Sequence, residues 1–169
     1  MIARYSRPAM TDVWSDRSRY HVWLEVELAV CKQLAAEGRI PRRDWTALKS
    51  AIEKLLKEGG VDPARVDEHE RTTRHDVIAF TTAVAEKIGP ISRYVHYGLT
   101  SSDVVDTSLS LLIQKAGAIL GADLERMLAE AMDGELHVIA QVRMDGREVL
   151  MPEPHGQGAI EVWSWPDAM

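Results

Sequence analysis

The feature that most constrains the fold is one apolar stripe that continues from about residue 102 to residue 132. Apolar residues recur every three or four positions along it, at Val105, Leu109, Leu112, Ala116, Leu120, Leu124 and Met127. That period is typical of a single buried helix face. A helix of roughly 30 residues is about 45 Å long. Because a small isolated bundle needs no helix of that length, we expect it to pack against long neighbours outside this chain.

Three shorter helices are predicted before it. Ser15 or Asp16 can cap the first, which ends near Gly38, and Pro41 begins the second. The third is predicted from about Thr72 to Ile88. Their apolar stripes are Trp23, Val26, Val30 and Leu34, then Trp45, Leu48, Ile52 and Leu55, then Val77, Phe80, Val84 and Ile88. Residues 1–14 are expected to be irregular, and residues 94–99 a short extended connection.

The pattern changes after residue 132. Residues 136–144 are rich in β-formers, Asp145-Gly146 is a turn signal, and residues 147–151 can return as a second strand. We therefore predict an all-α fold with an irregular or hairpin-like tail. A small helical N-terminal domain covers residues 1–101, the first long helix of a helical bundle covers 102–132, and a divergent tail covers 133–169.

Composition excludes several classes of protein. With 46% hydrophobic and 27% charged residues the chain falls in the globular range. A formal net charge of −6 argues against a nucleic-acid module, which needs surplus Lys and Arg. Cys31 is the one cysteine, so no internal disulfide is expected. The N-terminus is too polar for a signal peptide, and no run of about 18 apolar residues predicts a membrane span. These features favour a cytoplasmic protein.

Three polar clusters interrupt the helical pattern. Arg4-Tyr5-Ser6-Arg7 offers two cations and a phenol to a phosphate, or is a solvated tail. In residues 70–76, His75 lies between Arg74 and Asp76, which can orient it and tune its protonation, or the run is a charged first turn.

The third cluster is residues 96–103. Gly98 permits close approach of a ligand, and Thr100 and Ser101 with successive N–H groups can hold a carboxylate or phosphate. The alternative is an over-provided helix cap. No phosphate-loop glycine pattern, Cys pair or His-Glu-x-x-His motif occurs, so no metal site is predicted.

Together these segments resemble the adenylosuccinate lyase family of the fumarase/aspartase superfamily. The similar segments are Arg4-Tyr5-Ser6-Arg7-Pro8, Thr73-Arg74-His75-Asp76-Val77, and residues 95–107, Val-His-Tyr-Gly-Leu-Thr-Ser-Ser-Asp-Val-Val-Asp-Thr. The last is highly specific, and the likeness is expected to run from residue 1 to about residue 132.

The resemblance implies a cofactor-free carbon–nitrogen lyase of purine (AMP/IMP) biosynthesis. Such enzymes release fumarate from adenylosuccinate and from the related succinylocarboxamide ribotide, as homotetramers with a helical-bundle core. It implies that Arg4 and Tyr5 contact the phosphate end of the nucleotide. It also implies that the other substrate-binding residues are Arg74, His75, Asp76, Thr100 and Ser101, and that His75 and His96 are auxiliary catalytic residues. We expect His75, Asp76, Thr100 and Ser101 to converge on one surface.

The sequence departs from the family pattern after the long helix. The family places a Gly-Arg-Thr-His-Gly-type segment, with the general acid, after the long helix; here Gly146-Arg147 is followed by Glu148. The loop with the serine base has no match either. A frameshift, a misassembled gene or a truncated reading frame would explain the change after residue 132. We expect the chain alone to be inactive. The alternatives are a non-catalytic helical fragment that associates with partner chains, and another fumarate-yielding lyase of the superfamily.

Overall fold

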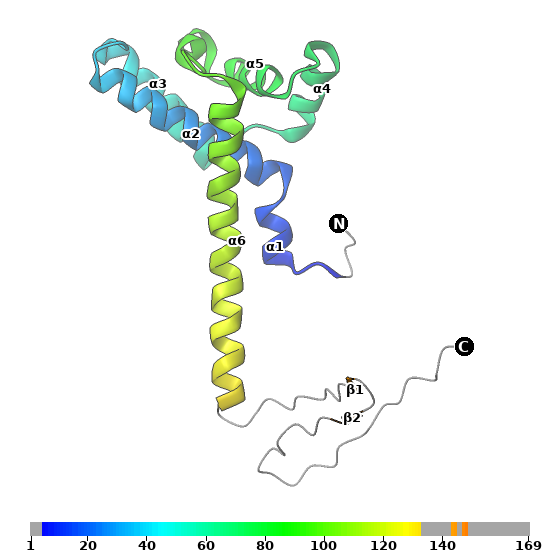
Figure 1. Ribbon diagram of the computed structural model, residues 1–169. Coiled ribbons are helices and arrows are strands. Elements are labelled where there is room, and N and C mark those ends of the chain that lie inside the picture. The colour runs from blue at the N-terminus through cyan, green and yellow to red at the C-terminus, as the bar shows by residue number, and fades with distance from the viewer. Residues whose placement is uncertain (1–4, 133–142, 145–146, 149–169) are drawn as a thin grey trace. The chain divides into compact units, whose positions relative to one another are not determined.

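The computed structural model of the 169-residue chain describes residues 5–132, 143–144 and 147–148. In that part the elements are α1 (Pro8–Val13), α2 (Asp16–Ala36), α3 (Arg42–Lys57), α4 (Pro63–Thr73), α5 (Asp76–Ile88), the 3-10 helix η2 (Gly89–Tyr94), α6 (Ser101–Met132), β1 (Arg143–Met144) and β2 (Arg147–Glu148) (Figure 1). The predicted all-α fold is confirmed. The chain divides into two compact units, Met1–Ile119 and Leu120–Met169.

The boundaries of α2 and α3 agree with the prediction. Ser15 is the N-cap of α2, and its hydroxyl accepts the Ser18 N–H at 3.1 Å. Gly38 adopts φ +76°, a left-handed conformation that costs glycine little, and it follows α2 where the chain must turn. Pro41 precedes α3, where the lack of an N–H is harmless.

Two α-helices were not predicted. Residues 8–13 form α1 rather than irregular chain, because Pro8 occupies the first helical position, where proline is tolerated. Helix α4 was missed because it is polar along most of its length and buries one apolar residue, Val66. Its start is nevertheless marked by Asp62, whose carboxylate accepts the Ala64 N–H at 3.1 Å, and by Pro63.

Two further predictions were wrong in the segments that carry the site. The helix predicted from about Thr72 instead starts at Asp76, because Arg74 adopts a left-handed φ of +51° and ends α4. Residues 94–99 are not extended: η2 ends at Tyr94, a turn follows, and His96 has φ +63°. Neither left-handed residue is glycine, so the residue types at these positions did not predict the two bends.

The core of the first unit lies between α2, α3 and α5. Tyr20, Trp23 and Phe80 form its aromatic centre, with ring centroids 5.3–5.9 Å apart. Each ring is at most 2% exposed. Leu24, Leu48 and other aliphatic residues from these helices surround them. This packing holds together α2 and α5, which carry residues of the candidate site.

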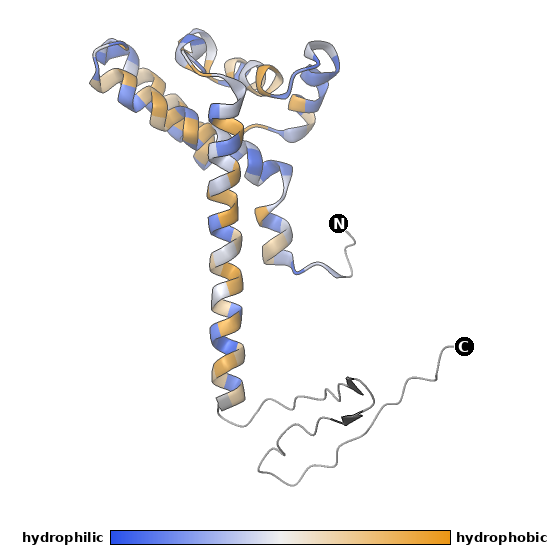
Figure 2. Ribbon diagram, in the orientation of Figure 1, coloured by the Kyte–Doolittle hydropathy of each residue, from blue (hydrophilic) through white to orange (hydrophobic). Residues whose placement is uncertain are grey.

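Helix α6 buries little of its apolar surface. Val104, Ser108, Leu112 and Ala116 are buried, whereas the exposed large apolar residues of the helix are Leu109, Ile113, Leu120, Leu124, Met127 and Leu128. Apolar residues recur along the whole helix (Figure 2). By length and composition alone, residues Ser101–Ala131 would suffice to cross a membrane, which is weak evidence because core helices of soluble proteins meet the same test.

The predicted hairpin falls mostly outside the described residues. The part that is described consists of β1 and β2, which pair antiparallel with Arg143 opposite Glu148. The predicted turn, Asp145-Gly146, lies outside it, as does Arg4 of the first polar cluster.

Candidate active site

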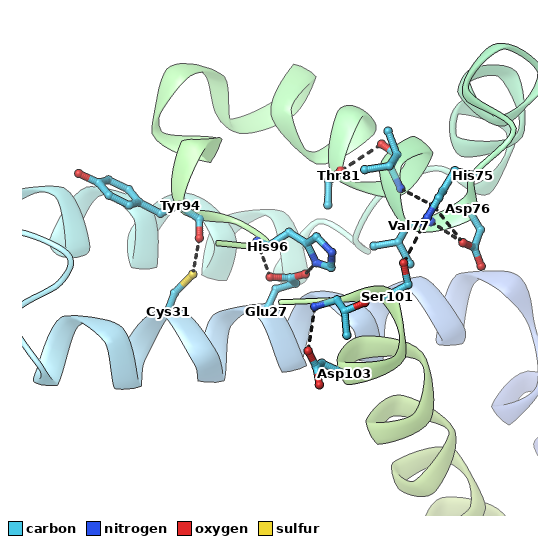
Figure 3. A network of polar contacts seen from close by, with 12 residues as sticks. Glu27, Cys31, His75, Asp76, Val77, Thr81, Tyr94, His96, Ser101 and Asp103 are labelled. Atoms are coloured by element: carbon cyan, nitrogen blue, oxygen red, sulfur yellow. Dashed lines mark hydrogen bonds and ion pairs between the residues drawn. The ribbon is translucent and has the colours of Figure 1, made fainter. Parts of the chain in front are cut away.

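His75 occupies the junction between α4 and α5. It is the N-cap of α5, and its Nδ1 accepts the Ile78 N–H at 3.4 Å. A neutral imidazole that accepts through Nδ1 carries its proton on Nε2. The Nε2 atom lies 3.3 Å from the Ser101 hydroxyl, 26 residues further along the chain (Figure 3). His75 therefore presents a proton-bearing nitrogen to the start of α6.

Asp76 stands beside His75 in the first turn of α5. Its Oδ1 accepts the Val77 N–H at 2.7 Å and lies 3.4 Å from His75 Nδ1. The positive end of the helix dipole stabilises a carboxylate at this position. When His75 is doubly protonated, its Nδ1–H can donate to Asp76 instead of accepting from Ile78. The structure thus provides a partner for His75 in both protonation states.

Thr100 and Ser101 lie at the start of α6. The Thr100 N–H donates to Asp103 Oδ2 at 2.8 Å, which satisfies one of the N–H groups around the helix start. Ser101 meets His75 through its hydroxyl, while Thr100 is exposed. The ends of two helices, α5 and α6, are thereby joined by the contact between His75 and Ser101.

Arg74 and Tyr5 are both exposed. The backbone N–H of Arg74 donates to Glu70 O at 2.8 Å, at the end of α4. Its left-handed backbone separates α4 from α5 and so sets the position of His75. Tyr5 is 75% exposed. The proposed phosphate contact of Arg4 and Tyr5 is therefore not defined by the described part of the chain.

His96 is held by a residue that the sequence analysis missed. Glu27, on α2, is completely buried, and its carboxylate accepts the His96 N–H at 2.7 Å. The other carboxylate oxygen lies 2.8 Å from His96 Nδ1. A signal was available, because Glu27 falls on the same helix face as Trp23, Val30 and Leu34. A charged residue on such a stripe is unusual and indicates a buried partner.

Cys31 adjoins this pair. Its thiol donates to Tyr94 O at 3.3 Å. Burial, with a further contribution from the Glu27 carboxylate one turn away, raises the pKa of the Cys31 thiol to about 12. Cys31 is consequently a neutral packing residue at physiological pH, and it ties η2 to α2 just before His96.

A hollow of about 290 Å³ borders Asp76 on another side. It is lined by Trp14, Asp16, Arg19, Trp23, Asp76, Val105, Ser108, Leu109 and Leu112. His75, Thr100 and Ser101 do not line it, so we place the candidate site at the junction of α5 and α6 and not in this hollow. Among the described residues, no group of three His, Cys, Asp or Glu side chains is arranged to hold a metal ion.

The chain is similar in sequence to known lyases. A protein family described as lyase matches residues 3–150. The chain is 44% identical over 151 residues to an adenylosuccinate lyase of Staphylococcus saprophyticus, covering 89% of this chain and 32% of that protein. It is 47% identical over 128 residues to an adenylosuccinate lyase of Bacillus subtilis, covering 76% and 28%.

The chain therefore spans about a third of the length of these curated relatives. The family match extends to residue 150, beyond residue 132, where the likeness was expected to end.

Proposed function

Since the chain belongs to the lyase family that matches residues 3–150, we propose that it carries the first part of an adenylosuccinate lyase. The reaction is a β-elimination that needs no cofactor. It releases fumarate from adenylosuccinate, and from succinylocarboxamide ribotide, in AMP and IMP biosynthesis. A base removes a proton next to a carboxylate, the carbanion is stabilised as an aci-carboxylate, and an acid protonates the leaving nitrogen.

The observation that carries the proposal is the contact of His75 with Ser101, 3.3 Å apart. It joins two of the three family-like segments, residues 73–77 and 95–107, which lie far apart in the sequence. Both residues stand at helix N-termini, where N–H groups and the helix dipole favour anions. The substrate carries carboxylates and a phosphate, so this junction suits the charge of its succinyl end.

Individual roles follow from these positions. Thr100 and Ser101 would donate to a substrate carboxylate, and exposed Arg74 would supply a cation next to it. Arg4 and Tyr5 would contact the phosphate. His75, with a proton on Nε2 in its neutral form, would be an auxiliary donor, and His96 a second auxiliary group.

The chain has no match for the general acid and the serine base of the family, so we expect very little turnover from it alone. Incubation with adenylosuccinate, followed by an assay of fumarate, measures this. Turnover on the order of 1–10³ per second would contradict the expectation.

Binding tests the function independently of turnover. Adenylosuccinate added to the isotopically labelled chain should shift the amide resonances of His75, Thr100 and Ser101, and His75→Gln should weaken the effect. His21→Gln is the matched control, because His21 is a partly exposed histidine of α2 that pairs with Glu25 at 3.7 Å and does not belong to the site. If the amide resonances of His75, Thr100 and Ser101 do not shift when adenylosuccinate is added, the proposed substrate is wrong. A response to a different fumarate-yielding compound would favour another lyase of the superfamily.

Assembly and location belong to the same proposal. A homotetramer built on a helical bundle would cover the exposed apolar residues of α6, and a purine-synthesis enzyme would act in the cytoplasm on a small nucleotide. Neither a nucleic acid nor a membrane is a proposed partner.

The exposed stripe of α6 also supports a second candidate function, which is association without catalysis. Replacing Leu120 and Leu124 with Glu should weaken self-association at least about 100-fold, because burial of each Leu contributes roughly 1.5–3 kcal/mol. Ala118→Glu with Ala122→Glu is the matched control, since both alanines are exposed and the change adds two charges at the same spacing on the other side of the helix. Sedimentation of the purified chain distinguishes the variants, and equal weakening by both would contradict an interface on the stripe.

A further inference from the structure

Core packing does not explain why the carboxylate of Glu27 is buried. It lies in the middle of the buried face of α2, and no part of the residue is exposed. A buried carboxylate is strongly destabilising unless charge or hydrogen bonds compensate it. Both hydrogen bonds described for it go to His96, one to the backbone N–H and one to the ring.

The two distances suit an ionised Glu27, because the backbone N–H of His96 can only donate and an ionised carboxylate accepts at both oxygens. The distances are 2.7 Å and 2.8 Å, as expected for hydrogen bonds to a charged carboxylate. An ionised carboxylate only accepts, so the nitrogen that faces it must carry a proton. In His96 that nitrogen is Nδ1, whether the ring is neutral or doubly protonated.

The surroundings hold His96 in this orientation. Its backbone is left-handed, with φ +63°, and such a conformation persists in a residue other than glycine only when neighbouring contacts stabilise it. Val95 is buried in the core, and Tyr94 O accepts from Cys31. In Figure 3 the His96 ring extends from Glu27 toward the side of the site where Val77 and Ser101 lie.

We propose that Glu27 is a positioning residue for His96: its carboxylate keeps the proton on Nδ1, so that Nε2 is the nitrogen that takes up and releases protons in the site. The structural part of this inference stands on the contacts alone. Its catalytic meaning rests on the proposed function.

The two histidines of the site then have opposite tautomers when neutral. His75 accepts through Nδ1 and carries its proton on Nε2, whereas His96 carries its proton on Nδ1. A hydrogen-bond donor and a hydrogen-bond acceptor are thus presented by two imidazoles of the same chain. Both are auxiliary groups in the proposed function, and one is suited to donate a hydrogen bond to the substrate while the other is suited to accept one.

Nitrogen NMR of the chain labelled with ¹⁵N-histidine tests the proposal, because two-bond correlations show which ring nitrogen carries the proton. His96→Gln identifies the His96 signals. As the pH is raised, Nε2 of His96 should lose its proton while Nδ1 keeps it. A wild-type His96 that retains the proton on Nε2 would overturn the proposal, even if no variant folds.

Glu27→Gln sharpens the test. The amide oxygen that this substitution introduces can still accept the His96 N–H, but the new NH₂ group would then donate to Nδ1, so the proton of neutral His96 should move to Nε2. Glu25→Gln is the control, since Glu25 lies two residues away on the surface of α2 and should leave the tautomer unchanged. An unchanged tautomer in folded Glu27→Gln would also overturn the proposal. None of these readouts needs substrate, so failure of the proposed function would be recognised separately by the binding and fumarate assays.

Discussion

Helices α2 and α6 have similar apolar periods and very different surroundings. Along its 21 residues α2 buries Tyr20, Val22, Trp23, Leu24, Val26, Glu27, Cys31 and Leu34. The 32-residue α6 buries four residues, all before position 117, and leaves six large apolar side chains exposed. The period of apolar residues therefore identifies the face of a helix that must be buried, but it does not specify which chain buries that face.

The difference in burial between α2 and α6 also determines on which helix polar side chains have fixed partners. Burial on α2 gives Glu27 and Cys31 fixed partners and, in the case of Cys31, a strongly shifted pKa. Only the start of α6, which contacts the first unit's core through Val104, contributes to the site. The following predictions test the contrast between the two helices.

Thiol labelling should show the largest effect. With a pKa of about 12, Cys31 has far less thiolate at pH 8 than an ordinary cysteine, and it should react at least about 1000-fold more slowly. A cysteine introduced by Leu124→Cys on the exposed stripe should react at the ordinary rate. The double-cysteine chain should therefore label in two well-separated phases, and one fast phase would contradict the burial of Cys31.

The same shift predicts a pH dependence of stability. The pKa of Cys31 is raised in the folded chain, from 9.0 to about 12. Its contribution to stability is therefore complete below about pH 9 and is lost as the pH rises toward 12. Urea unfolding across that range measures it, and Cys31→Ala should flatten this part of the profile.

Matched leucine truncations should give the next largest effect. Leu24→Ala in α2 removes a fully buried side chain and should lower the free energy of unfolding by about 2–5 kcal/mol. Leu124→Ala in α6 changes a side chain that is 56% exposed, so the change should stay within about 0.5 kcal/mol. Urea titrations at low protein concentration compare the two. Equal losses would mean that α6 is covered in solution.

Serine substitutions should give the smallest effect. Ser15→Ala removes the cap of α2 and should cost about 1 kcal/mol. Ser110→Ala, in the interior of α6, removes only a hydroxyl that bonds back to Asp106 O and should be neutral or slightly stabilising. Thermal unfolding of both variants would distinguish them, and a larger loss for Ser110→Ala would reverse the expected order.

Much of the fold could be predicted because its signals are local. The cap of α2 and the apolar stripes of α2, α3 and α6 depend on residues only a few positions apart, and there the helices form as predicted. Helix α4 could not be found from periodicity, because it presents one buried apolar residue, Val66. The break between α4 and α5 at Arg74 could not be predicted, because arginine is not a residue type that indicates a left-handed backbone.

By itself the sequence determined the helical class, the placement of the long helices and the family of the chain, since these depend on local spacing and on short specific motifs. Only the tertiary structure decided which polar residues meet. His75 reaches Ser101 because α5 and α6 begin beside each other. Glu27 reaches His96 across 69 residues because η2 packs on α3 and α5, and the Cys31 thiol of α2 donates to Tyr94 O at the end of η2. Such contacts depend on how helices pack, which the spacing of residues along one helix does not specify.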